Sequence, residues 1–191
     1  IGLPGDSYEK SVDSAKTAAE IGPSVARLYP TVIIKGTELH EMYRRGEYTP
    51  FSDETMLHTV KDMYRILTEA GVQIIRVGLK STDLISARGE VAGGYHPAFR
   101  QLVEAELAKD QMEAQLEDLC SRNPDGFARL RGIIFTSSRS SLSNMIGNRK
   151  SNRVWIEKKY PHVRFTFHVD ESLPDGQYRL VSQNIVTNEI R

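Results

Sequence analysis

The chain has 191 residues with the composition of an ordinary globular protein, and its 25 basic and 25 acidic side chains cancel. The balanced charge excludes a global attraction to nucleic acid or membranes, and no apolar stretch approaches the roughly 20 residues that a membrane helix needs. The single cysteine, Cys120, excludes an internal disulfide and any multi-cysteine metal site built from this chain alone, and we expect a cytoplasmic protein.

The first six residues predict the end of a strand, a tight turn and the start of a helix. Gly2 and Gly5 permit a sharp turn and a close approach of the backbone to a ligand, and Pro4 stiffens that turn. An ordinary strand-to-helix connection would explain the same residues. Because the sequence opens in mid-structure and without an initiator methionine, we expect the back half of a larger enzyme.

Helices and strands alternate up to residue 77. The expected elements are a helix from Ser7 to about Ile21 with Asp6 and Glu9 as a capping box, strands over 25–29 and 31–34, and a short helix capped by Thr37. A longer helix follows, capped by Ser52, with Asp53 and Glu54 in its first turn and its end at Gly71, and then a strand over 72–77. This alternation indicates βαβ units and a parallel sheet. We predict an α/β fold, the later β/α units of a partial TIM-type barrel, with a site at the carboxyl ends of its strands.

The pattern changes after residue 80. Residues 81–95 predict a loop rich in serine and glycine, and His96-Pro97 begins a long amphipathic helix. A strong turn signal follows at residues 123–126. Short elements come next: strands over 132–136, 164–169 and 178–181, and helices over 141–146 and 152–160. We therefore divide the chain into a barrel part, residues 1–123, and a small α+β extension without βαβ units, residues 124–191.

Four runs of residues at strand ends or helix starts are candidates for a site. They are Gly2-Leu-Pro-Gly-Asp6, Arg27-Leu-Tyr-Pro-Thr31 with Lys35 to Glu38, Arg76-Val-Gly-Leu79, and Tyr95-His-Pro-Ala-Phe-Arg-Gln101. In this order and spacing they resemble the C-terminal half of radical S-adenosylmethionine (SAM) proteins related to the Elongator catalytic subunit. A more distant resemblance is to oxygen-independent coproporphyrinogen III oxidase. Residues 147–152 look like the C-terminal extension of the bacterial members.

The resemblance implies a partial barrel whose N-terminal half carries three cysteines that bind a [4Fe-4S] cluster, with one iron open to SAM. Reductive cleavage of SAM would then give a radical that abstracts hydrogen from a substrate. Those cysteines lie outside these 191 residues. We therefore expect this fragment to supply part of the SAM and substrate walls, to hold neither cofactor alone, and to be inactive alone.

Roles follow from the resemblance residue by residue. The expected cofactor-binding residues are Gly2, Pro4, Gly5, Tyr29, Pro30 and Thr31. The expected substrate-side residues are Arg27, Lys35, Arg76, His96 and Arg100, where His96 and Arg100 have the spacing of one helical turn. Plain alternatives stand beside these roles: salt bridges for the two strand arginines, a capped helix entry for Lys35, and a cap or packing role for His96.

The C-terminal part carries a local excess of positive charge. Residues 139–164 hold seven lysines and arginines against the single acid Glu157. Within this segment Arg149, Lys150 and Arg153 are the nucleic-acid candidates, and an RNA backbone is the ligand that such a segment would track. Docking on an acidic protein surface, or a simply solvated face, explains the same charges.

Two other features predict structure rather than chemistry. The serines of residues 137–143 lack the sequence context of a nucleophile, and we interpret them as turn and capping residues. Cys120, near the end of an amphipathic helix, reads as a packed thiol.

Three functional hypotheses remain. The leading one is a radical SAM enzyme fragment with tRNA as substrate, the second is an enzyme acting on a porphyrin precursor through arginine contacts to propionates, and the third is a non-catalytic module that binds RNA or protein. The expected partners are the N-terminal half of the same protein, RNA, and a second copy joined through an exposed sheet edge; no membrane is expected.

Overall fold

The computed structural model describes residues 1–79, 90–93 and 95–185. The chain forms two compact units, residues 1–103 and residues 104–191, and the division falls inside helix α4 (Phe99–Arg122). This division concerns compactness alone, so the boundary at residue 124 between the barrel part and its extension stays a prediction.

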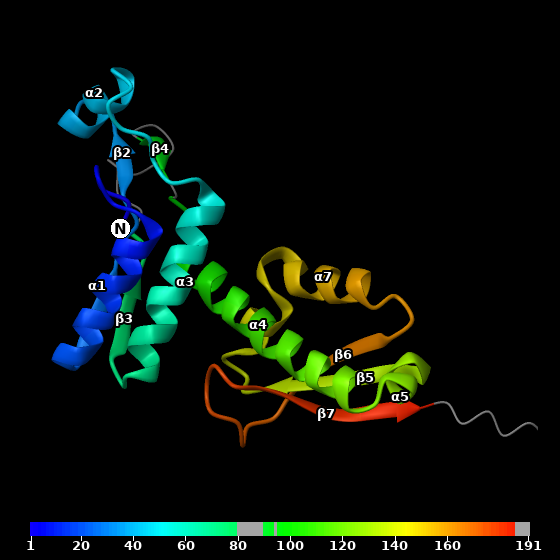
Figure 1. Ribbon diagram of the computed structural model, residues 1–191. Helices are drawn as coiled ribbons and strands as arrows, with labels where there is room; N and C mark the ends of the chain where they lie inside the picture. The colour runs from blue at the N-terminus through cyan, green and yellow to red at the C-terminus, as the bar shows by residue number, and fades with distance from the viewer. Residues whose placement is uncertain (80–89, 94, 186–191) are drawn as a thin grey trace, which may run out of the picture. The chain divides into compact units, whose positions relative to one another are not determined.

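The first unit follows the expected alternation. Its elements are α1 (Tyr8–Ile21), β1 (Val25–Leu28), β2 (Val32–Ile34), α2 (Glu38–Arg44), α3 (Asp53–Glu69), β3 (Gln73–Val77) and β4 (Glu90–Gly93), followed by the start of α4. The predicted caps of α2 and α3 are confirmed, because Thr37 and Ser52 accept hydrogen bonds from the backbone three residues on. Figure 1 shows α1 and α3 side by side.

The parallel sheet is confirmed for two strands only. β1 and β3 pair in parallel, as the βαβ pattern predicts. β2 does not join them: it pairs antiparallel with β4, which lies inside the segment predicted as a loop. Pro30, with no backbone N–H, is buried between β1 and β2 and ends the first pairing there. The rest of the predicted loop, residues 81–89 and 94, lies outside the described residues.

The Asp62 carboxylate of α3 links this helix to α1. The Tyr8 hydroxyl donates to Asp62 at 2.7 Å, and the Tyr8 and His58 rings stack with centroids 5.3 Å apart. Arg65 also pairs with Asp62. Apolar side chains of both helices are buried around this contact, among them Val12, Ala15, Met56, Val60, Met63 and Leu67. The start of α1, and with it the turn that precedes it, is thereby held against α3.

The second unit contains a three-stranded sheet. Its elements after α4 are α5 (Pro124–Arg129), β5 (Leu130–Ser137), α6 (Leu142–Ile146), η1 (Asn148–Lys150), α7 (Ser151–Lys159), β6 (Arg164–Val169) and β7 (Tyr178–Ile185). The strand order is β6-β5-β7, with β7 antiparallel to β5. β5 and β6 are parallel and are joined through α6 and α7. The prediction that this part contains no βαβ unit was therefore wrong.

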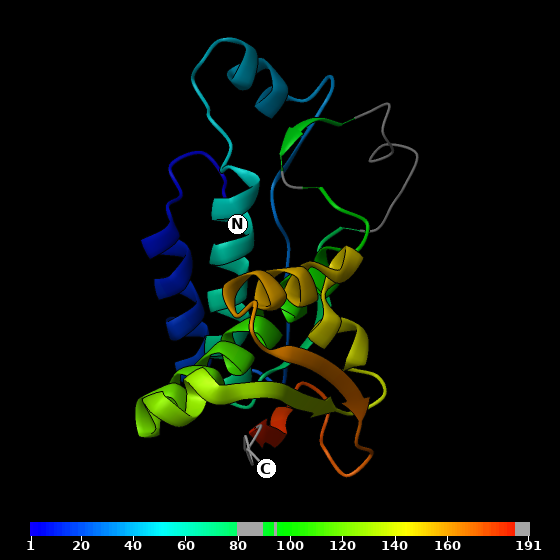
Figure 2. The same ribbon diagram turned by 90° about the vertical axis from the view of Figure 1, so that its right-hand side faces the viewer.

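The prediction of a turn at residues 123–126 also needs correction. Asn123 accepts a hydrogen bond from the Gly126 N–H and caps α5, with Pro124 in the first helical turn, so the turn signal marks a helix start. Side chains of the helices and strands form one core around Met112, Phe135 and Ile156, and the half-buried Cys120 packs against it, as predicted. Figure 2 shows the strands of this unit from a second side.

The serines of residues 137–143 form turns, as predicted, although Ser141 makes no side-chain cap for α6. Ser138 donates to Asp175 at 2.6 Å, and Ser141 Oγ accepts from the Gly176 N–H at 2.8 Å. These bonds tie the loop after β5 to the turn before β7.

The fold is mixed α/β and is built on small sheets, with no closed barrel among the described residues. None of the helices in the described ranges is long and apolar enough to cross a membrane.

Candidate functional site

Residues 1–6 form a turn, called here the Gly2 turn, in which side chains bond to both the N–H and the carbonyl oxygen of Gly2. The Gly2 N–H donates to Asp6 Oδ2 at 2.6 Å, and the Tyr48 hydroxyl donates to the Gly2 carbonyl oxygen at 2.5 Å. The capping box predicted from Asp6 to Glu9 was wrong: Ser7 is the N-cap of α1 and accepts from the Lys10 N–H. The carboxylate of Asp6 therefore stabilises the turn and does not cap the helix.

The two glycines of the turn face different surroundings. Both have φ near +80°, a conformation that disfavours any residue with a Cβ. A Cβ at Gly2 would lie 2.9 Å from Met56 Cε and 3.6 Å from the Phe51 ring, whereas a Cβ at Gly5 would meet nothing within 4 Å. Gly2 is therefore the packed side of the turn, and exposed Pro4 and Gly5 are the open side on which a ligand can approach.

The turn adjoins the end of β1. The Thr31 N–H donates to the Ile1 carbonyl oxygen at 2.9 Å, and the Ile1 amino group donates to the Tyr29 carbonyl oxygen at 3.0 Å. The structure thus brings together both groups of residues predicted to bind cofactor. Tyr29 is exposed, Thr31 is half-buried, and Pro30 is buried.

A shallow pocket lies next to these residues at the carboxyl ends of β1 and β3. Its lining is mostly apolar and comprises Pro30, Val32, Gly78, Leu79, Tyr95, His96 and Phe99. His96 Nδ1 accepts a hydrogen bond from the Ala98 N–H at 3.1 Å, so the neutral imidazole carries its proton on Nε2. His96 therefore makes a local hydrogen bond just before α4, which begins at Phe99, and also lines the pocket.

The two strand arginines lie directly opposite each other. Arg27 of β1 and Arg76 of β3 are register partners; Arg27 is exposed and Arg76 half-buried. Neither forms an ion pair with a carboxylate in residues 1–79, 90–93 and 95–185, so the salt-bridge alternative finds no acidic partner there. Two neighbouring cations without a counter-charge repel each other, and an anionic ligand would relieve that repulsion.

Lys35 and Arg100 have different surroundings. Exposed Lys35 lies in the turn that leads into α2, where Thr37 is the N-cap, so the helix-entry interpretation is confirmed. Arg100 donates from its guanidinium to the Ile74 carbonyl oxygen of β3 at 3.1 Å. Because α4 begins at Phe99, His96 and Arg100 do not share a helical face, and the polar pair expected from their spacing was wrong.

Of the three nucleic-acid candidates, one has a nearby counter-charge. Arg153 pairs with Glu157 on α7 at 2.8 Å. Arg149 and Lys150 are exposed at the start of α7, both with positive φ (51° and 66°), and form no ion pair with the described part of the chain. Among the three candidates, the charges without an ion pair in the described part of the chain are therefore these two consecutive residues.

Sequence reasoning missed Tyr48, Phe51 and Met56 as the support of the Gly2 turn. Their distance along the chain from Gly2 gave no local signal. The only indication was that Gly2 precedes a helix that must pack on its neighbour, and this does not single out a tyrosine 46 residues away.

The fold and the strand-end residues define an α/β domain with a candidate ligand site at the carboxyl ends of β1 and β3. Residues 23–109 match the family model described as the Radical_SAM C-terminal domain, so this region of the chain is the C-terminal domain of a radical SAM protein.

Curated relatives support this assignment. The chain is 30% identical over 111 residues to a tRNA uridine(34) acetyltransferase of Dehalococcoides mccartyi, covering 56% of this chain and 24% of the relative. It is 36% identical over 62 residues to a tRNA uridine(34) acetyltransferase of Methanocaldococcus infernus (31% and 12%). An uncharacterized protein of Methanocaldococcus jannaschii is 34% identical over 68 residues (36% and 21%). The matches thus span at most about a quarter of these relatives.

The bonds to Asp6 predict a pH-dependent stability. Partial burial alone raises the pKa of Asp6, but hydrogen bonds from the Gly2 N–H, the Ser11 hydroxyl and the Ser7 N–H outweigh it and hold the pKa below its ordinary value of 3.8. A depressed pKa in the folded state contributes stability that is complete above the ordinary pKa and is lost as the pH falls through the folded value.

We therefore expect the free energy of unfolding to fall below about pH 4 in the wild-type chain and to fall less steeply in Asp6→Asn. Urea unfolding between about pH 6 and pH 2.5 measures this difference. Asp13→Asn, an exposed aspartate on α1, is the matched control. Parallel pH profiles for Asp6→Asn and the wild type would show that the carboxylate does not stabilise the turn.

Proposed function

We propose that this chain is the C-terminal part of a cytoplasmic radical SAM enzyme that modifies tRNA. The observation that carries the proposal is the family match of residues 23–109, together with relatives whose names specify tRNA uridine modification. On this proposal residues 1–123 are the later β/α units of a partial barrel, and residues 124–191 form a small extension.

The chain's residues suit one of the two implied cofactors. A [4Fe-4S] cluster needs several cysteine thiolates, and Cys120 is the one cysteine in the sequence, so the cluster ligands must come from another part of the enzyme. For SAM, the open face of the Gly2 turn at Pro4 and Gly5 permits backbone approach, as such a ligand requires. When bound, SAM and the cluster supply the radical chemistry.

The part that this chain plays is binding and positioning. The Gly2 turn and Tyr29 to Thr31 form one wall for SAM, and the pocket with His96 faces the same strand ends. The packing of Gly2 on Met56 and Phe51 holds this wall in place from the side away from the ligand. The fragment alone is inactive because it lacks the cluster ligands.

Arg27 and Arg76 are proposed to contact an anionic part of the substrate. These two register partners, without a carboxylate partner in the described part of the chain, suit a phosphate of RNA. They suit the propionates of a porphyrin precursor equally well, and this observation keeps coproporphyrinogen-type chemistry as the second candidate.

The experiment that decides between these functions uses the full-length protein, anaerobically reconstituted with iron and sulfide. The formation of 5'-deoxyadenosine from SAM is followed with unmodified tRNA, with coproporphyrinogen, and with neither. We expect stimulation by tRNA alone. Stimulation by coproporphyrinogen alone would favour the second candidate, and the absence of both a cluster and SAM cleavage would leave a binding module.

Arg149 and Lys150 are proposed to contact RNA phosphates. The double substitution Arg149→Gly/Lys150→Gly removes both charges and retains the turn, because glycine adopts positive φ without strain. We expect weaker tRNA binding by the 191-residue chain and a log-log salt dependence shallower by about one to two units.

The matched control for this measurement is Arg153→Gln, since Arg153 is already paired with Glu157. We expect the control to bind within about twofold of the wild type. Equal affinities and equal salt slopes for the double variant and the wild type would exclude this segment as the RNA contact.

Self-association through a free strand edge is the remaining partner proposal. β1 and β3 form a two-stranded sheet within the described residues, and such a sheet leaves edges that a second copy can pair with. Light scattering that finds a monomer across the accessible concentrations would refute it.

A further inference from the structure

We propose that Tyr48 is a positioning residue for SAM, acting through the Gly2 turn. The proposal rests on the proposed function, in which the open side of this turn binds SAM. It adds a residue outside the four strand-end and helix-start runs, one that does not itself touch the ligand.

The inference rests on the hydrogen bonds and the packing of Gly2. Tyr48 is 7% exposed and lies between α2 and α3, and its hydroxyl donates to the Gly2 carbonyl oxygen while Asp6 receives the Gly2 N–H. Both polar groups of Gly2 are thus bonded to side chains. The same glycine packs against Phe51 and Met56, which come from the segment that follows Tyr48.

The residues directly before Tyr48 make several contacts at the end of α2. Arg45 forms ion pairs with Glu38 and Glu47, and the Glu47 N–H donates to the Met42 carbonyl oxygen at 2.9 Å. These contacts close the end of α2 directly before Tyr48. The hydroxyl thus reaches Gly2 from the segment that directly follows α2, and Gly2 lies two residues before the exposed Pro4.

The residues that hold the turn are different from those that would contact the ligand. The packed side of the turn is held by Tyr48, Phe51, Met56 and Asp6, and the open side has nothing within 4 Å of a Cβ at Gly5. Removal of the Tyr48 hydroxyl leaves the Gly2 carbonyl oxygen buried without this donor. The turn then loosens although no atom that faces the ligand has changed.

The test is Tyr48→Phe in the cluster-loaded full-length protein, with SAM affinity measured by titration calorimetry. We expect SAM to bind about five- to tenfold more weakly, the size of one lost hydrogen bond, with unchanged cluster absorbance. Hydrogen exchange should rise in peptides that contain residues 1–6 and stay constant in peptides from α7.

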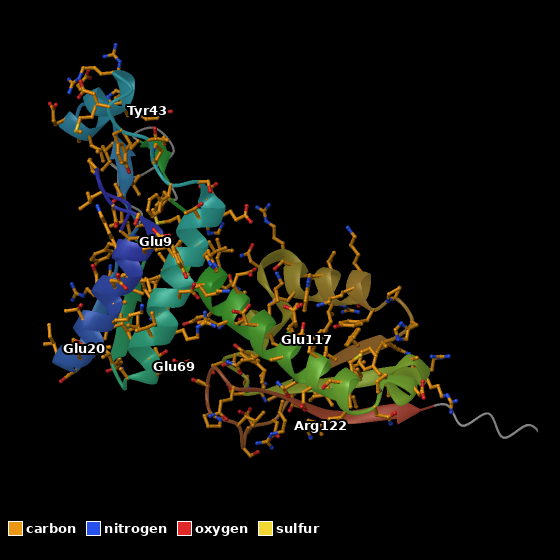
Figure 3. All side chains as sticks on the ribbon, in the orientation of Figure 1. Glu9, Glu20, Tyr43, Glu69, Glu117 and Arg122 are labelled. Atoms are coloured by element: carbon orange, nitrogen blue, oxygen red, sulfur yellow. The ribbon has the colours of Figure 1, made fainter. Side chains whose placement is uncertain are left out.

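Tyr43→Phe is the matched control, because Tyr43 on α2 is 38% exposed and is labelled on that helix in Figure 3. Faster exchange at residues 1–6 with unchanged SAM affinity in Tyr48→Phe would overturn the positioning role and leave a structural one. Failure of the wild-type protein to bind SAM would instead overturn the proposed function, so the two failures are distinguishable.

Discussion

Gly2→Ala is expected to destabilise the first unit by about 2–4 kcal/mol, the sum of an unfavourable positive φ and an overpacked contact. The new Cβ would lie 2.9 Å from Met56 Cε, in a place already bounded by the Phe51 ring. Met56 is 1% exposed, so its end has little room to move away. Urea unfolding of the 191-residue chain, followed by circular dichroism, measures the loss.

Gly5→Ala is the matched control for this substitution. Gly5 has the same positive φ, but a Cβ there meets nothing within 4 Å, so only the backbone term of about 1–2 kcal/mol remains. The difference between the two variants isolates the packing of Gly2. Equal losses would mean that Gly2 is not packed against Met56, and the support of the turn would have to be reconsidered.

Asn152→Ala is expected to destabilise the second unit by about 2–4 kcal/mol, because it removes the donor to two backbone carbonyl groups. Asn152 is 1% exposed, and its amide nitrogen donates to the Ala105 oxygen at 2.7 Å and to the Asn144 oxygen at 3.1 Å. These bonds join the start of α7 to α4 and to α6. Thermal and urea unfolding of the chain measure the effect.

Val154→Ala, at a residue of the same helix with 59% exposure, controls for a change on α7 and should cost less than about 0.5 kcal/mol. Asn152→Leu separates the hydrogen bonds from the volume, since leucine has a similar size and no donor. If Asn152→Leu were as stable as the wild type, the amide bonds would not contribute to the stability of this unit.

Local patterns predicted the helices of the first unit well. The caps Thr37 and Ser52 and the acidic first turn of α3 are short-range signals, and the structure confirms both helices. Asp6 shows the limit of such signals: its spacing to Glu9 suits a capping box, but a serine one residue later caps the helix while Asp6 bonds to Gly2.

Strand pairing was harder to predict than strand position. The segments 31–34 and 164–169 were both placed well, yet β2 pairs antiparallel with β4, and β6 pairs in parallel with β5. Pairing depends on where the chain returns, which residue types alone do not encode. Asn152 was likewise read as an ordinary start of a helix, because burial of its amide depends on α4 and α6.

The candidate site was predictable in outline and not in its supports. Glycine turns and strand-end positions pointed to residues 2–5 and 29–31, and the bonds of Ile1 to Tyr29 and Thr31 bring the two groups together. Tyr48 was not predictable, because a tyrosine in a connecting segment has no periodic or motif signal. Its importance arises from the tertiary contact with Gly2 alone.

The central claim is that the Gly2 turn and the end of β1 form a wall of the SAM site. Photo-crosslinking with 8-azido-SAM in the cluster-loaded full-length protein, followed by peptide mapping, tests it most directly, with excess SAM as competitor. The account predicts SAM-protected cross-links within residues 1–6 or 29–31. Protected cross-links confined to other parts of the protein would contradict it.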